Sequence, residues 1–201
     1  MYYIVGLGNP EEKHAGTRHN TGRIVLADFL KRHHLPVPMV SKKYLSRVTE
    51  AEISGEDVLI LWPETYMNKS GSAVGKAVTS AQKAQRLIVI YDDIDLPLGT
   101  SKISYGRGAG GHRGLESIIR ALKTKDFVRI RVGIAPTMPS GKLKKPKGEE
   151  KVIEFLLSDF KKQEREILAK VSTRVGEAIE TIISDGLAAA MNQCNQDPSQ
   201  K

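Results

Sequence analysis

The sequence contains a single cysteine, Cys194, and no hydrophobic run that approaches the ~20 residues of a membrane-spanning helix. One cysteine cannot form an internal disulfide, so a disulfide-stabilised framework is excluded. The first residues, Met1 to Gly6, lack the basic and then apolar pattern of a signal peptide. These absences together predict a cytoplasmic protein that does not enter a membrane.

Signatures of covalent catalysis and of cofactor binding are missing or incomplete. No serine lies in a G-x-S-x-G motif, and no tight spacing of His and Asp indicates a metal site. The segment Gly106 to Gly111 matches G-x-G-x-x-G, but Ile134-Ala135-Pro136 stands where the acid of a dinucleotide site is expected. We therefore expect no metal and no cofactor, and a nucleotide-dependent enzyme is the weakest functional hypothesis.

The charge is positive and unevenly distributed. The net formal charge is +8 and the pI is about 9.5. The basic residues gather between Lys102 and Arg131 and between Lys142 and Lys147. A basic surface of this kind favours a polyanionic partner such as nucleic acid, although it also serves solubility.

Hydrophobic patterning predicts strands that alternate with helices. We expect strands at 2–5, 47–53, 57–62, 87–91, 102–105 and 127–134, with the second and third forming a hairpin. We expect helices at 21–33, 69–85, about 115–122, 149–156 and 161–186. The predicted fold class is α/β: one domain over 1–191, a sandwich whose twisted mixed β-sheet is flanked by helices. Residues 192–201, which include Cys194, are predicted to form a polar, flexible tail.

Polar side chains follow several of the predicted strands. In open α/β sheets, ligands bind beyond the carboxyl ends of the strands, so these side chains are expected to converge. His19 opens the first long helix and can accept a proton near neutral pH. Asp92 ends the most apolar strand and could orient His19; a turn cap or a metal ligand are the alternatives for Asp92. Asn9 and Asn68 could donate to a developing oxyanion or simply stabilise turns.

No nucleophile accompanies the predicted His–Asp pair, so the pattern favours a directly activated water. The glycine-rich loop at 106–114 carries Arg107, His112 and Arg113. With the following helix N-terminus it could bind a backbone phosphate, or it could be purely structural.

Six motifs in register resemble bacterial peptidyl-tRNA hydrolases, from Tyr3 to about Asn192. They are Gly6-Leu7-Gly8-Asn9-Pro10, Thr17-Arg18-His19-Asn20, Tyr66-Met67-Asn68-x-Ser70-Gly71, Asp92-x-x-Asp95-Leu96-Pro97-x-Gly99, Gly110-Gly111-His112-x-Gly114 and Arg129-x-Arg131-x-Gly133-Ile134. Several independent motifs with matching order and spacing are far more specific than any single glycine loop.

The resemblance implies hydrolysis of the ester between a peptide and the 3′ ribose of tRNA, by a monomer that needs no metal and recycles tRNA from aborted translation. It implies that His19 is the general base, that Asp92 orients it, and that Asn68 and Asn9 are catalytic amides that hold the water or substrate. Asn9 would also help distinguish a blocked aminoacyl group from a free one. The resemblance further implies a set of residues that bind substrate or tRNA: His14, Asn20, Tyr66, Met67, Asn68, Lys102, Arg113 and Arg131.

Three positions depart from the family pattern. Glu11 replaces a glycine, His14 replaces a tyrosine linked to tRNA contact, and Arg113 replaces an asparagine that contacts substrate or water. Arginine cannot accept a hydrogen bond, but it binds phosphate strongly. Arg113 therefore favours the second hypothesis, an RNA-binding relative with weak or lost hydrolase activity, whereas the intact His19, Asp92, Asn68 and Asn9 favour the enzyme.

Overall fold

The computed structural model describes residues 1–195 and contains one seven-stranded mixed sheet. The strand order is β2-β3-β4-β1-β5-β7-β6. The strands are β1 (Tyr2–Gly6), β2 (Met39–Ser41), β3 (Ser46–Ile53), β4 (Glu56–Pro63), β5 (Leu87–Pro97), β6 (Ser101–Tyr105) and β7 (Val128–Ala135). The four central strands are parallel, and the antiparallel strands lie at the two edges. The predicted mixed α/β sandwich is confirmed.

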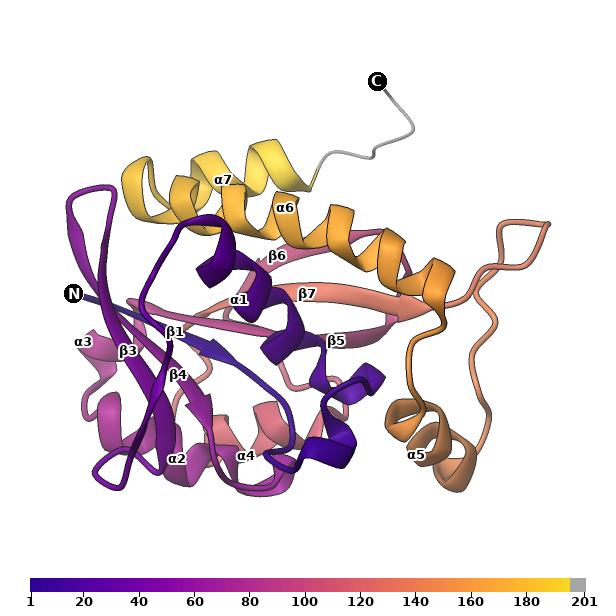
Figure 1. Cartoon of the computed structure of the whole chain (residues 1–201), viewed down its shortest axis with the longest axis horizontal. Helices are drawn as coiled ribbons and strands as arrows, with labels where there is room; N and C mark the ends of the chain where they lie inside the picture. Colours follow the sequence, from indigo (N-terminus) through magenta and orange to yellow (C-terminus); the bar gives the residue numbers. More distant parts are fainter. Residues whose placement is uncertain (196–201) are drawn as a thin grey trace.

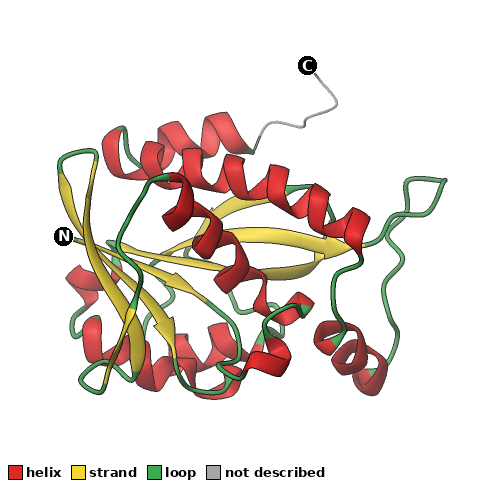
Figure 2. Ribbon diagram, viewed as in Figure 1, coloured by secondary structure: helices red, strands yellow, loops and turns green. Residues whose placement is uncertain are grey.

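Helices cover both faces of the sheet (Figures 1 and 2). One face carries α1 (Thr21–Arg32), α6 (Lys162–Ser184) and α7 (Leu187–Cys194), and the other carries α2 (Ser70–Ala77), α3 (Ala81–Ala84) and α4 (Arg113–Leu122). Alternation along the central strands explains the two cores. Ile88 and Ile90 of β5 face α1 and α6, whereas Val89 and Tyr91 face α2 and α4.

Helix α5 (Glu149–Leu157) lies apart from these layers, beyond the carboxyl ends of the central strands (Figure 1). None of its residues is buried. The lysine-rich segment 136–148 leads into it from β7. Three short 3₁₀ helices complete the fold: η1 (Glu12–His14), η2 (Arg18–Asn20) and η3 (Met67–Lys69).

The structure corrects several details of the sequence prediction. Strand β5 runs to Pro97, so Asp92 lies within this strand instead of ending it. The helix expected at 69–85 is broken after Ala77, because Ser80 caps a new helix by accepting a hydrogen bond from the backbone N–H of Lys83. The short edge strand β2 and helix α7 have no counterpart in the sequence prediction. Helix α7 runs to Cys194, past the predicted start of the polar tail at 192; residues 196–201 of that prediction lie outside the described residues.

Within residues 1–195, no helix combines the length and apolar character that crossing a membrane requires.

Candidate active site

The loop after β1 places His19 against the centre of the sheet. Gly22, at the start of α1, lets the helix backbone approach β5 closely. Any other residue at this position would place its Cβ 2.2 Å from the carbonyl oxygen of Ile90 in β5. Behind His19, the buried Arg18 donates to Glu164 and to the backbone carbonyl of Asp159, at 2.8 and 2.9 Å. The 3₁₀ turn that carries His19 is therefore fixed on both sides.

His19 and Asp92 form a buried pair. The Nδ1 atom of His19 lies 3.0 Å from each carboxylate oxygen of Asp92. Burial by itself lowers the pKa of His19, but the charge and hydrogen bond of Asp92 outweigh it, so the pKa lies above its usual value near 6.5. Burial opposes ionisation of Asp92, but its contacts with two histidines hold the pKa of that carboxyl well below its usual range. Asp92 is therefore an ionised carboxylate held against Nδ1 of His19.

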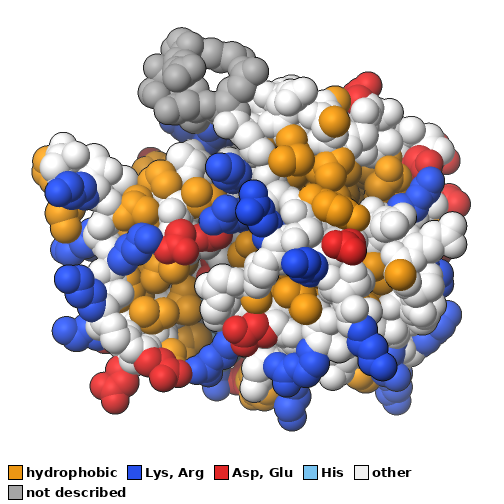
Figure 3. Space-filling model, turned by 180° about the vertical axis from the view of Figure 1, so that it is seen from behind, with side chains coloured by type: hydrophobic (Ala, Val, Ile, Leu, Met, Phe, Trp, Pro, Cys, Tyr) orange, Lys and Arg blue, Asp and Glu red, His pale blue; other side chains and the backbone are white. Residues whose placement is uncertain are grey.

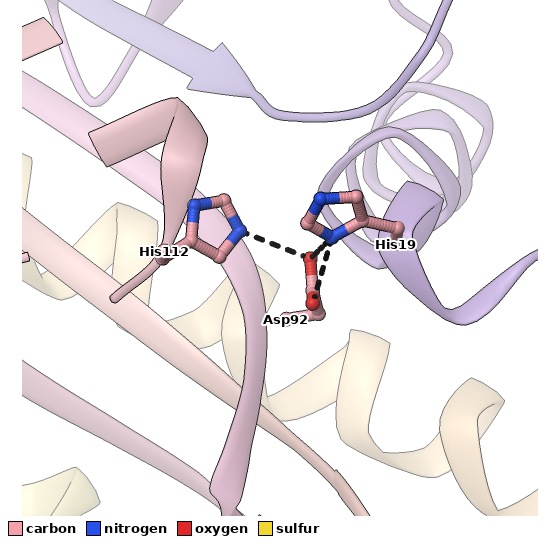
Figure 4. Close-up of side chains that lie close together, drawn as sticks. All are labelled: His19, Asp92 and His112. Carbon is pink, nitrogen blue, oxygen red and sulfur yellow. Dashed lines mark hydrogen bonds and ion pairs between the residues drawn. The ribbon is translucent and has the colours of Figure 1, made fainter. Parts of the chain in front are cut away.

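The second histidine is His112, whose contact with Asp92 the sequence did not predict. Its Nε2 lies 3.2 Å from Asp92 Oδ1, so the two rings approach one carboxylate from different sides (Figure 4). Its Nδ1 accepts hydrogen bonds from the backbone N–H groups of Gly114 and Leu115 at the start of α4. An acceptor nitrogen carries no proton, so the ring proton lies on Nε2 and is donated to Asp92.

This arrangement also occupies the first N–H groups of α4. The sequence suggested that this helix N-terminus could bind a phosphate, but His112 already caps it. The signal that could have revealed this role is the position of His112 directly before a helix, where a side-chain acceptor is favoured.

Asn9 is held in place from both sides. Its backbone N–H and carbonyl pair with the side-chain amide of Asn20, at 2.8 and 2.9 Å. Its side-chain Oδ1 accepts a hydrogen bond from the backbone N–H of Met67 at 2.9 Å. Because the oxygen is occupied, Asn9 presents only the N–H donors of its Nδ2 to a ligand.

His19, Asp92, His112 and Asn9 line a cleft of about 1070 Å³. Its walls contain most of the side chains that the sequence predicted to be functional: Asn9, His19, Tyr66, Met67, Asn68, Asp92, Lys102, Arg113 and Arg131. Two do not line it. Asn20 is buried behind Asn9, where both atoms of its amide are used, and His14 lies on η1 outside the cleft wall.

The cleft combines charged and apolar walls. Arg131 donates to Asp93 at 2.7 Å, and Arg113 donates to Glu149 at 2.7 Å, whereas Lys102 is exposed and forms no ion pair within residues 1–195. Helix α5 contributes apolar side chains to the cleft, namely Val152, Ile153, Leu156 and Leu157. Figure 3 shows the face opposite to that of Figure 1, on which Lys and Arg side chains lie among hydrophobic patches.

The His19–Asp92–His112 group is also the arrangement that could hold a metal ion. Each residue offers one ligand atom, and the three atoms lie within 4.8 Å of one another. The hydrogen bonds described above account for the contacts among the three side chains, and one of the three ligand atoms, on Asp92, is deeply buried.

Comparison with known proteins identifies the family of the chain. The family model described as peptidyl-tRNA hydrolase matches residues 3–201. The chain belongs to the peptidyl-tRNA hydrolase family. It is 41% identical to the peptidyl-tRNA hydrolase of Herpetosiphon aurantiacus over all of this chain and 93% of the relative, and 40% identical to that of Thermodesulfovibrio yellowstonii over 98% and 100%.

Solved structures agree with this assignment. The crystal structure of peptidyl-tRNA hydrolase from Acinetobacter baumannii superimposes with a TM-score of 0.86 and 28% sequence identity, covering 98% of this chain and 95% of that one. The family, the fold and the class of carboxylic ester hydrolase predicted from the sequence are confirmed. The comparisons give no support to the alternative of a non-catalytic RNA-binding relative.

Proposed function

We propose that this protein cleaves the ester between a peptide and the 3′ ribose of tRNA, with His19 as the general base. The observation that carries the proposal is the buried His19–Asp92 pair at the floor of a cleft large enough for the end of an RNA and the peptide attached to it. Asp92 occupies Nδ1 of His19, so the neutral ring turns its unprotonated Nε2 away from Asp92 and can accept a proton from water.

The reaction then needs no covalent enzyme intermediate. The water gives a proton to His19 and attacks the ester carbonyl, and the carbonyl oxygen becomes an oxyanion. Asn9 Nδ2 and Asn68, both on the cleft wall, supply donors for that oxyanion or for the water. When the tetrahedral intermediate collapses, the 3′ oxygen leaves and takes the proton from His19. The products are a tRNA with a free 3′ hydroxyl and a peptide with a carboxylic acid, which releases its proton to solvent and becomes a carboxylate.

Asn9 also explains selection for a blocked amino group. Its Oδ1 is held by Met67, so only donors face the substrate. An amide carbonyl of a peptide can accept from these donors, whereas a free ammonium group cannot. We therefore assign to Asn9 the discrimination between peptidyl-tRNA and aminoacyl-tRNA.

The remaining predicted residues are assigned to substrate binding according to their place. Tyr66 and Met67 lie on the cleft wall beside the amides and are assigned to the RNA end and the first peptide residues. Lys102, Arg113 and Arg131 are assigned to tRNA phosphates. Asn20 acts through Asn9, and His14 is available only to tRNA that extends beyond the cleft.

Three further properties remain our predictions: location in the cytoplasm, a monomeric state, and catalysis that needs neither a metal nor a cofactor. A chelator should therefore leave the rate of hydrolysis unchanged.

The direct test compares two substrates with the purified protein. N-acetyl-aminoacyl-tRNA should be hydrolysed, while the same aminoacyl-tRNA with a free amino group should be hydrolysed far more slowly. Tight binding of tRNA without hydrolysis of the blocked substrate would instead support a purely RNA-binding function.

A further inference from the structure

Arg113 and Glu149 join the two walls of the cleft. Arg113 is the first residue of α4, Glu149 is the first residue of α5, and the guanidinium Nη2 lies 2.7 Å from the Glu149 carboxylate. Both residues line the same cleft as His19. The cation that replaces the family's usual asparagine is thus held by a carboxylate of the opposite wall.

This ion pair is the most exposed of the three that arginine or lysine forms with an acidic residue of the cleft lining within residues 1–195. The side chains of Arg113 and Glu149 are 56% and 76% exposed, compared with 26% and 10% for Arg131 and Asp93. The pair between Lys145 and Asp95 is intermediate. Solvent screens an exposed pair strongly, so it is weak and easily exchanged for another anion. A phosphodiester suits this exchange, since the planar guanidinium binds two phosphate oxygens at once.

Arg113 also lies close to the reacting group. It directly follows His112, whose Nε2 lies 3.2 Å from the Asp92 carboxylate that holds His19, and its positive charge opposes protonation of His19. A phosphate bound to Arg113 would therefore belong to the last nucleotides of the RNA, next to the ester, rather than to a distant part of the tRNA.

We propose that Arg113 exchanges Glu149 for a phosphate next to the scissile ester, so that Glu149 is an internal competitor that limits affinity for the RNA. The inference rests on the proposed function, in which Arg113 binds a tRNA phosphate, and adds to it the competition of Glu149 for that arginine. Glu149 stands in for the phosphate in the free protein, and RNA binding frees the start of α5 from α4.

The test measures the Kd of deacylated tRNA, which needs no hydrolysis, for four variants. Glu149→Gln should bind about two- to fivefold more tightly than wild type, because the competitor is removed. Glu150→Gln is the matched control: it removes the same charge from the next residue of the same exposed helical turn, and Glu150 forms no ion pair within residues 1–195. It should change the Kd much less.

Arg113→Gln should weaken binding and reduce the salt dependence by about one phosphate contact. The double variant Arg113→Gln/Glu149→Gln should bind like Arg113→Gln alone, since Glu149 then has no cation to block. If Glu149→Gln and Glu150→Gln have equal effects, or if the gain persists without Arg113, the exchange does not occur.

A minimal substrate locates the phosphate. An N-acetyl-aminoacyl trinucleotide retains only the phosphates nearest the ester, and Arg113→Gln should raise its KM as well. An effect seen with full tRNA but not with the trinucleotide would contradict the placement beside the ester. If the wild type binds tRNA but hydrolyses neither substrate, the proposed function fails, while the Kd measurements still decide the exchange.

Discussion

Nδ1 of His19 lies 3.0 Å from both carboxylate oxygens of Asp92, in a site where Asp92 is almost completely buried. This relationship has opposite consequences for stability and for catalysis. The charged pair stabilises the fold when His19 is protonated, whereas a general base must be neutral.

The pH dependence of activity follows from the raised pKa of His19. We expect kcat/KM to increase with pH and to level off above the pKa of His19, which lies above 6.5. In Asp92→Asn the carboxylate charge is lost, so the rising limb should move to lower pH while the plateau falls on the order of 10²–10⁴-fold. A pH–rate profile of each protein checks this. If the rising limb of the pH–rate profile lies at the same pH in Asp92→Asn and in the wild type, a group other than His19 controls the rate.

The pH dependence of stability should differ from that of activity. The pKa of His19 is raised, so its contribution is complete below 6.5 and is lost as the pH rises through the pKa in the folded state. The pKa of Asp92 is lowered, so its contribution is complete above 3.8 and is lost only in stronger acid. The pair therefore stabilises most between these values. Urea unfolding should show Asp92→Asn less stable than wild type by about 1–3 kcal/mol at about pH 5, with a smaller difference at alkaline pH. A difference that grows with pH would contradict this assignment.

His112 has two separable roles, as the cap of α4 and as a second donor to Asp92. Asparagine is a good cap but is too short to replace the imidazole donor. Both variants lose the hydrogen bond to Asp92, and His112→Ala should be less stable than His112→Asn by about 0.5–2 kcal/mol, because it also loses the cap. Both variants release Asp92 to interact more strongly with His19. The rising limb of the pH–rate profile should therefore shift to higher pH in both, and no shift would exclude His112 as a positioning residue.

Gly114 leaves room for the side chains around the amides. A Cβ at this position would lie 2.5 Å from Met67 Sδ and 3.0 Å from His112 Cε1. Gly114→Ala should therefore lose about 1–3 kcal/mol of stability and reduce kcat. Gly75→Ala in α2 is the matched control, because its Cβ meets only Ala121 at 3.9 Å and alanine favours the helix. Equal thermal midpoints for the two variants would contradict the packing argument.

The general position of the site could be predicted from the sequence. Apolar strands followed by polar residues place His19, Asp92, Asn9 and Asn68 at one edge of a parallel sheet, and the cleft contains all four. Local sequence signals are sufficient for this prediction, because the carboxyl ends of parallel strands lie at the same edge of the sheet.

Contacts between distant segments could not be predicted in the same way. His112 reaches Asp92 only because the glycine loop adopts backbone angles at Gly110 and Gly111 with positive φ, which the sequence permits but does not specify. The Arg113–Glu149 pair depends on where α5 lies. Because none of the residues of α5 is buried, its hydrophobic pattern does not indicate which part of the fold it packs against. By contrast, the break before α3 has a local signal, because Ser80 is a residue type that favours the N-cap of a new helix.

The most direct test of the central claim is the rate of hydrolysis of N-acetyl-aminoacyl-tRNA by His19→Ala. We expect a loss of kcat/KM of at least about 10²–10⁴-fold, with the Kd for deacylated tRNA and the circular dichroism spectrum unchanged. A folded His19→Ala protein that retains the activity of the wild type would contradict the assignment of His19 as the general base.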